Sequence, residues 1–228
     1  MPNGLRLVLF GPPGAGKGTQ TRLLSDHLEV QSLSTGDLFR YNLQQQTPLG
    51  LKASEYMNQG ALVPDEVTID MVLEKVMSIP SNDGFILDGF PRNPVQANAL
   101  DDALSRRSRP LDLVIAIDVP DGELINRLGG RMVCRDCQAP HRLESGQKPG
   151  SSELKCGRCG GELYQRDDDT PAAVHRRIEV YQNETSPLLE FYRQKGLLEE
   201  VGGLDTVANV YRKVLAKIQR VSKTGDRE

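Results

Sequence analysis

Tryptophan is absent from this 228-residue sequence, and histidine occurs only three times. No apolar run approaches the ~20 residues that a helix needs to cross a bilayer, and the N-terminus lacks the basic start and apolar stretch of a signal peptide. The formal net charge of −3 gives no long-range attraction to nucleic acid or to an anionic membrane surface. These absences predict a cytoplasmic protein without nucleic-acid or membrane partners, and nothing in the sequence calls for more than a monomer.

Cysteine is also scarce, and its four residues are clustered. They form two Cys-x-x-Cys pairs separated by 18 residues: Cys134, Cys137, Cys156 and Cys159. In a cytosolic chain this clustering favours a metal over disulfides, and the spacing matches a zinc site with four thiolate ligands. Two redox pairs or free thiols are the alternative, but neither pair opens a helix in a thioredoxin-like context. Because four ligands close the coordination sphere, the predicted zinc is structural.

Glycine, by contrast, is concentrated near the start, in the sequence GPPGAGKGT at positions 11–19. The apolar segment Leu5–Phe10 precedes it and a helical pattern follows, which is the context of a loop that binds nucleotide phosphates. Glycines let backbone N–H groups turn toward a phosphate, while the helix N-terminus and Lys17 add positive charge. The general pattern places serine or threonine at Gly18, whereas here the hydroxyl comes at Thr19. The loop is predicted to bind a nucleoside triphosphate rather than to be a simple turn.

Two apolar runs predict buried strands. They are Phe85–Leu87 and Leu113–Val119, and helical stretches separate them. This alternation is typical of an α/β fold with a parallel sheet, in which ligands bind beyond the carboxyl ends of the strands. Lys17, Asp88 and Asp118 are therefore expected at or near one sheet edge. Asp88 is predicted to help position a hydrated magnesium ion, with a strand-ending turn aspartate as the alternative.

Two segments interrupt this alternation and are predicted to be insertions. Residues 34–63 are mostly polar and helical in type, with a break at Pro48–Gly50, and have too few apolar positions to form a core alone. From Arg131 to Asp169, cysteines, glycines and prolines appear and the periodicity vanishes. A helix capped by Thr170 and a last strand at Leu197–Val201 are expected after the second insertion.

The motifs along the chain resemble those of the adenylate kinases over nearly its whole length. They are GPPGAGKGTQ (11–20), STGDLFR (34–40), LVPDE (62–66), GFILDGFPRNPVQA (84–97), RLGGR (127–131) and QRDDD (165–169), followed by Arg177. The resemblance implies magnesium-dependent phosphoryl exchange, ATP + AMP ⇌ 2 ADP, which serves adenine-nucleotide homeostasis. It also implies a P-loop NTPase-type parallel five-stranded sheet flanked by helices, with a helical insertion that binds the nucleoside monophosphate and a zinc-bearing lid. The implied parts are a core of residues 1–33, 64–129 and 170–228, the monophosphate-binding insertion 34–63 and the lid 130–169.

The resemblance also assigns roles to individual residues. The implied catalytic group is a lysine, an aspartate and four arginines: Lys17, Asp88, Arg92, Arg131, Arg166 and Arg177. The implied ATP contacts lie in the glycine-rich loop and around the lid: Gly14, Ala15, Gly16, Lys17, Gly18, Thr19, Arg127, Arg131, Pro140 and His141. The implied AMP contacts are spread over several motifs: Thr35, Arg40, Ala61, Leu62, Val63, Gly89, Phe90, Pro91, Arg92, Gln96, Arg166 and Arg177. Planar guanidinium groups chelate phosphate oxygens in a way that lysine cannot, which suits the arginines to the transferring phosphate.

Two positions depart from the family pattern. Thr68 stands where relatives often place an apolar residue against the base, and His141 stands where they usually have tyrosine. Gln96 carries a donor and an acceptor and is suited to reading an adenine edge. Thr68 nevertheless leaves open the alternative of a kinase for another nucleoside monophosphate.

An alternative hypothesis from another class of protein is an ATP-dependent nucleic-acid-binding protein with a zinc ribbon. The lid carries six cations: Arg131, Arg135, Arg142, Lys148, Lys155 and Arg158. The acidic chain and the scarcity of aromatic stacking platforms in the lid disfavour this alternative.

Overall fold

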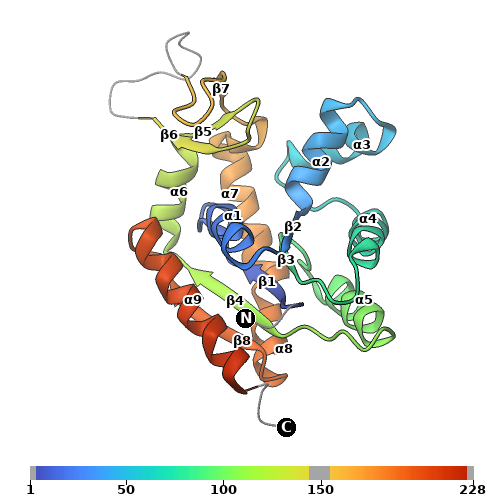
Figure 1. Ribbon diagram of the computed structural model, residues 1–228. Helices are drawn as coiled ribbons and strands as arrows, with labels where there is room; N and C mark the ends of the chain where they lie inside the picture. The colour runs from blue at the N-terminus through green and yellow to red at the C-terminus, as the bar shows by residue number, and fades with distance from the viewer. Residues whose placement is uncertain (1–3, 144–154, 225–228) are drawn as a thin grey trace.

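The computed structural model describes residues 4–143 and 155–224, so the lid cation Lys148 lies outside the described residues. A five-stranded parallel sheet forms the centre, in the order β2-β3-β1-β4-β8, and helices flank it (Figure 1). Its strands are β1 (Arg6–Phe10), β2 (Gln31–Ser34), β3 (Phe85–Asp88), β4 (Leu113–Asp118) and β8 (Leu198–Gly202). The predicted α/β fold with a five-stranded parallel sheet is confirmed.

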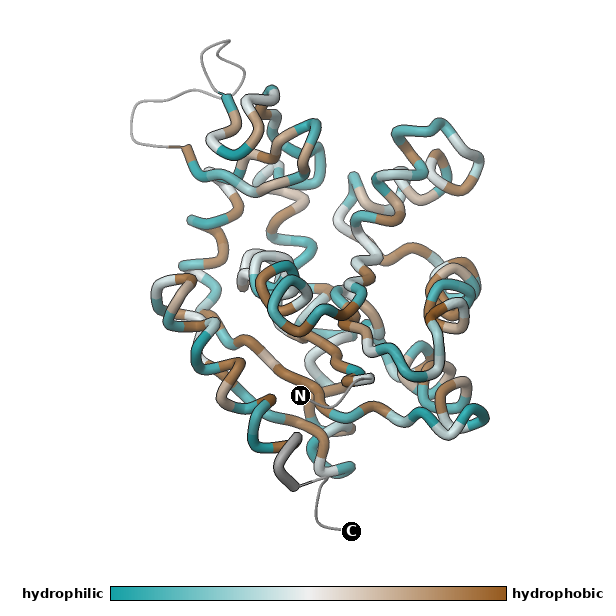
Figure 2. Tube along the Cα trace, in the orientation of Figure 1, coloured by the Kyte–Doolittle hydropathy of each residue, from teal (hydrophilic) through white to brown (hydrophobic). Residues whose placement is uncertain are grey.

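The central strands are buried on both faces because helices cover both. Side chains alternate along a strand, so Val8 and Phe10 pack on one face while Leu7 and Leu9 pack on the other. The first face is covered by α4 (Asp65–Ser78), α5 (Pro94–Ser105) and α8 (Pro187–Gln194). The second is covered by α1 (Lys17–Leu28) and α9 (Val207–Thr224), and Figure 2 shows α9 alternating between hydrophobic and hydrophilic residues.

The strand register brings the carboxyl ends to one edge of the sheet. Leu9 of β1 and Ser34 of β2 both pair with Asp88 at the end of β3. Asp118 at the end of β4 likewise pairs with Gly202 at the end of β8. The loops that follow all five strands therefore leave the sheet on the same side.

Residues 34–63, called here the helical segment, form two helices that pack against each other, α2 (Thr35–Gln44) and α3 (Pro48–Met57). The Ser34 side chain caps α2 by accepting a bond from the Asp37 N–H. The break between the helices lies at residues 45–47, whereas the sequence predicted it at Pro48–Gly50, which lies inside α3. Thr47 caps α3, and Pro48 occupies its first turn, where the missing N–H of proline costs nothing.

Residues 130–169, called here the cysteine segment, follow α6 (Asp121–Gly129). The described part contains a small antiparallel sheet of β5 (Arg131–Cys134), β6 (Pro140–Arg142) and β7 (Leu163–Tyr164), which periodicity did not predict. A 3-10 turn at Asp167–Asp169 leads into α7 (Pro171–Val180), which Thr170 caps as expected. Both segments lie at the same end of the molecule (Figure 1). Within the described residues no helix is long and apolar enough to cross a membrane.

Candidate functional site

A cleft of about 1080 Å³ lies at the carboxyl edge of the sheet, between the core and the two segments. Nearly all of the nucleotide contacts expected from the sequence line it, from the glycine-rich loop to Arg177. Two do not. Phe90 is 1% exposed and packs in the core, and Pro91 lines an adjoining cavity of about 80 Å³. The cleft thus brings together residues that lie far apart in the sequence.

The glycine-rich loop connects β1 to α1 and forms part of the cleft wall. Gly14 and Gly16 have φ angles of 86° and 96°, a region that disfavours side chains, and Gly16 is the N-cap of α1. Lys17 begins the helix and donates from Nζ to the carbonyl oxygens of Gly11 and Pro12, at 2.6 and 3.0 Å. Helix N-terminal amides and an ammonium group therefore face the same space, which is an arrangement that favours phosphate.

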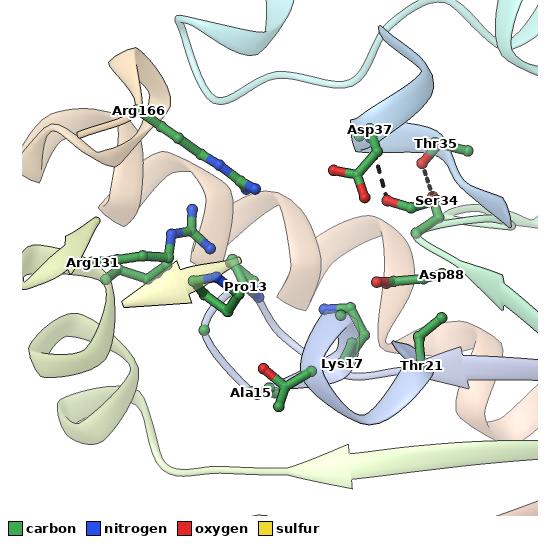
Figure 3. A pocket seen from close by; sticks show the side chains of 18 of the residues that line it. Pro13, Ala15, Lys17, Thr21, Ser34, Thr35, Asp37, Asp88, Arg131 and Arg166 are labelled. Carbon is green, nitrogen blue, oxygen red and sulfur yellow. Dashed lines mark hydrogen bonds between the residues drawn. The ribbon is translucent and has the colours of Figure 1, made fainter. Parts of the chain in front are cut away.

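Lys17 and Asp88 are neighbours on the floor of the cleft (Figure 3). Burial lowers the pKa of Lys17 to about 8, and the carboxylate of Asp88 opposes this shift. Burial likewise raises the pKa of Asp88, and Lys17 opposes that shift. A Cβ placed on Gly18 would lie 3.4 Å from the Asp88 Oδ2 atom. Glycine at this position therefore leaves the carboxylate oxygen open to the cleft.

Among the arginines that line the cleft, five come from both segments and from the core: Arg40, Arg92, Arg131, Arg166 and Arg177. Figure 3 shows Arg131 and Arg166 on the opposite side from the start of α2. Burial, followed by the charge of Arg177, lowers the pKa of Arg92 to about 10. Burial, followed by the charge of Arg40, does the same for Arg166. The buried Nε atoms of Arg40 and Arg166 have no hydrogen-bond partner among the described residues, and a bound anion would satisfy such donors.

Asp169 holds two of these arginines in place. Its side chain is buried and accepts from Arg131 Nε and Nη2, at 2.7 and 2.5 Å. Arg177 Nη1 donates to the same carboxylate at 2.9 Å and to the backbone oxygen of Asp168 at 2.9 Å. Charge-assisted bonds of this kind fix the planes of guanidinium groups. Residues at both ends of the cysteine segment are therefore connected to α7 by hydrogen bonds through Asp169.

Across the cleft from Arg131 and Arg166, the wall is formed around the loop that follows β3 (Figure 3). Thr35 Oγ1 and Arg92 Nε both donate to the carbonyl oxygen of Gly89, at 2.9 and 2.8 Å. Gln96 is 1% exposed, and its Oε1 accepts from the Arg92 N–H at 2.8 Å. Ala61 to Val63, at the end of the helical segment, line the same cleft.

The loop between β8 and α9 was not among the predicted site residues, although Asp205 to Val207 line the cleft. Arg127 connects to this loop, because its Nη2 donates to the Gly203 oxygen at 3.0 Å while its Nε donates to Glu123 at 2.8 Å. The predicted last strand, combined with the rule that ligands bind beyond strand carboxyl ends, would have identified this loop.

The four cysteines form one cluster in the cysteine segment, with their sulfur atoms within 4.8 Å of one another. Cys134 and Cys159 lie 3.4 Å apart, and Cys137 and Cys156 lie 3.6 Å apart, with no disulfide between any of them. A tetrahedral zinc with Zn–S bonds of about 2.3 Å needs sulfur atoms about 3.8 Å apart. The donor set and spacing fit a structural zinc site. His141 Nε2 lies 3.2 Å from Cys156 Sγ, so the cluster borders the cleft.

Comparisons with known proteins agree with this geometry. The chain is 46% identical to an adenylate kinase of Streptomyces avermitilis over 95% of its own length and 98% of the relative's. It is 47% identical to an adenylate kinase of Methanocella arvoryzae (96% and 100% of the two chains) and 48% identical to one of Moorella thermoacetica (90% and 94%). The family model for adenylate kinase matches residues 9–197. With this agreement in sequence and in the architecture of the cleft, the chain belongs to the adenylate kinase family.

Proposed function

We propose that this protein is an adenylate kinase that transfers a phosphoryl group reversibly from magnesium-ATP to AMP, giving two molecules of ADP. The observation that carries the proposal is the convergence of Lys17, Asp88 and five arginines on one cleft that is large enough for two nucleotides. Phosphoryl transfer requires two substrates held in line, dispersed positive charge on the moving group and exclusion of water. A cleft bordered by two segments supplies these conditions.

The ATP side comprises the loop that precedes α1 and the facing part of the cysteine segment. Gly14 to Thr19 would cradle the phosphates with backbone N–H groups, and Lys17 would contribute a charge. Arg127, Pro140 and His141 also line the cleft and would contact the adenosine part.

The AMP side comprises the helical segment and the loop after β3. Arg40 would bind the AMP phosphate, because its Nε has no partner among the described residues. Thr35 and the backbone of Ala61 to Val63 would surround the nucleoside, and Gln96 would read the base edge. In this assignment residues 34–63 are the monophosphate-binding insertion and residues 130–169 are the lid of one core.

The transferring phosphate would lie between the two sides, where Arg92, Arg131, Arg166 and Arg177 neutralise the charge spread over its oxygens. Asp88 fits a hydrated magnesium ion, since it lines the cleft beside Lys17 and glycine at position 18 leaves its Oδ2 atom open. When bound with ATP, magnesium neutralises phosphate charge. The cysteine cluster would hold zinc with a structural role, since four thiolates leave no open coordination position.

We also propose that the protein acts as a monomer in the cytoplasm. The cleft that would hold both nucleotides is lined by residues of one chain, so the proposal needs no second copy. The four thiols are not paired in disulfides, which fits a reducing compartment.

A coupled assay of transfer from magnesium-ATP to AMP, CMP, UMP and GMP, run side by side, tests the function. We expect strong preference for AMP. Activity mainly on another base would keep the reaction but change the substrate, with Thr68 as the first residue to examine. Absence of transfer to all four by folded, zinc-loaded protein would refute the proposal. Lys17→Met should lose most activity while keeping the fold, and near-normal turnover would contradict the role of the loop.

A further inference from the structure

Both polar atoms of the Gln96 side-chain amide form hydrogen bonds within the protein. Its Nε2 donates to Asp65 Oδ1 at 2.7 Å, and its Oε1 accepts from the Arg92 N–H at 2.8 Å. Gln96 lines the cleft and is 1% exposed, so its side chain has little room to move. Asp65 is a half-buried residue in the first turn of α4, and the resemblance gave it no role.

The two partners permit only one orientation of this amide. An ionised carboxylate only accepts hydrogen bonds, and a backbone N–H only donates. Turning the Gln96 amide over would place its NH2 group against the Arg92 N–H and its oxygen against the Asp65 carboxylate. Both bonds would then be replaced by contacts between like groups, in a buried place where unsatisfied polar groups are costly.

Asp65 is itself fixed by a third residue. Asn93 Nδ2 donates to the same Asp65 Oδ1 atom at 2.8 Å, while Asn93 Oδ1 accepts from the Gln96 N–H at 3.0 Å. Asn93 caps α5, whereas Asp65 begins α4. The carboxylate therefore joins the starts of two helices, and its position does not depend on Gln96 alone.

We infer that Asp65 is a positioning residue that makes the cleft select a 6-amino purine monophosphate over a 6-oxo purine monophosphate. The inference rests on the proposed function, in which Gln96 reads the base. After its bonds to Asp65 and Arg92, the amide retains one N–H and one oxygen lone pair. Adenine offers an acceptor at N1 and a donor at N6, which match this pair. Guanine and hypoxanthine offer a donor at N1 and an acceptor at O6, and they would need the amide reversed.

A simpler role for Asp65 is to place negative charge at the N-terminus of α4, which any acidic residue there would do. Glu66 lies in the same first turn and is exposed, which makes it a matched control. Glu66→Gln removes the same charge from the same helix end and leaves the Gln96 amide held. Asp65→Asn, in contrast, provides a side chain that can either accept or donate, so one of the two restraints on the Gln96 orientation is lost and only the Arg92 N–H still opposes the reversed amide.

The test compares kcat/KM for AMP and for IMP, which carries a 6-oxo group without the 2-amino group of GMP. In Asp65→Asn we expect the AMP-to-IMP ratio to fall roughly tenfold or more, because rejection by unpaired buried groups produces large ratios. Glu66→Gln should keep the wild-type ratio. Asp65→Ser is a second variant that also removes the carboxylate, because its hydroxyl can accept or donate a hydrogen bond.

The outcomes separate this inference from the proposed function. If the wild type phosphorylates AMP and both Asp65 variants keep its AMP-to-IMP ratio, Asp65 does not set the selectivity and the inference fails. An equal fall in Glu66→Gln would assign the effect to helix charge and would also overturn it. If the wild type transfers phosphate to neither nucleotide, the proposed function itself fails. Thermal unfolding of each variant confirms that the ratios refer to folded protein.

Discussion

The helical segment and the cysteine segment are both too small to form a core alone, and each is stabilised in a different way. In the helical segment Phe39, Ala53 and Val63 are buried together, and Val67 and Met71 of α4 complete their cluster. In the cysteine segment two of the five buried residues of the apolar cluster are metal-type ligands, Cys134 and Cys156. One segment thus shares hydrophobic residues with the core, while the other gathers four cysteines into a cluster that we propose holds zinc. A small insertion needs an external source of stability, and a neighbouring helix or a metal ion can each provide it.

The largest effect is expected from removing the zinc that we propose for the cysteine segment. Structural zinc contributes on the order of 10 kcal/mol to the folding of small zinc-binding peptides. Cys134→Ser should therefore unfold this segment, raise hydrogen exchange in residues 131–143 and remove most phosphoryl-transfer activity. Metal analysis together with exchange measurements checks this, and the helical segment should retain its protection. Wild-type protein treated with a chelator should regain its exchange protection and its activity on addition of zinc. Unchanged hydrogen exchange in metal-free protein would show that this segment does not need the metal.

The second effect concerns the cluster that the helical segment shares with α4. Phe39 is 5% exposed, so Phe39→Ala should lower the free energy of unfolding by about 3 kcal/mol. Because this segment borders the AMP side, KM for AMP should rise while KM for ATP stays near its wild-type value. Leu51→Ala is the control, since Leu51 is 46% exposed in α3 and should change stability by less than about 0.5 kcal/mol. Equal losses in the two variants would refute the shared core.

A smaller effect should come from the attachment of the cysteine segment to α7. Asp169→Asn weakens bonds to Arg131 and Arg177 in a buried place and should cost about 2 kcal/mol of stability. The exposed pair of Arg135 and Glu162, 3.3 Å apart, lies in the same segment. Glu162→Gln should cost less than about 1 kcal/mol. Denaturant unfolding of both variants measures the difference, and a Glu162→Gln loss as large as that of Asp169→Asn would contradict it.

The smallest effect belongs to the glycine-rich loop, which lines the same cleft as both segments. The pKa of Lys17 is about 8, below its ordinary value of 10.5, and a bound phosphate anion would favour the charged form. ATP binding at pH 8 to 9 should therefore take up less than one proton, with little uptake at pH 7, where Lys17 is already charged. Without ligand, the unfolded chain binds more protons between pH 8 and 10.5, so the free energy of unfolding should rise across that window.

Calorimetry in buffers of different ionisation enthalpy measures the proton uptake. Lys17→Arg stays charged throughout and should show none, whereas Phe39→Ala should behave like the wild type. Equal uptake in Lys17→Arg and in the wild type would assign the proton to another group.

Much of the sheet and of the cleft could be predicted from the sequence because their signals are local. The apolar runs at Phe85 and Leu113 place β3 and β4 to within a residue or so, and the glycine-rich loop falls where its flanking strand and helix indicated. The small strands of the cysteine segment could not be predicted in this way. Their burial depends on a cysteine cluster and not on a periodic apolar pattern.

Long-range contacts were beyond local patterns as well. Asp65 and Gln96 are 31 residues apart, and nothing in either motif indicates that they bond. Phe90 belongs to a motif expected to contact AMP, yet its side chain fills the core, since neighbours in a loop can face opposite ways. The turn at Tyr181–Thr185 is π-helical, and Thr185 Oγ1 donates to the Arg92 oxygen at 2.8 Å. A helical pattern read along the chain predicts neither feature.

The position of β8 also has a consequence for synthesis. This strand is the last to be made, and it pairs with β4 at one edge of the sheet. The cleft loop from Gly203 to Val207 follows it directly. A nascent chain that ends before β8 therefore leaves the β4 edge without its partner and lacks one wall of the cleft. Nearly all of the described chain must therefore be synthesised before the cleft has its full lining.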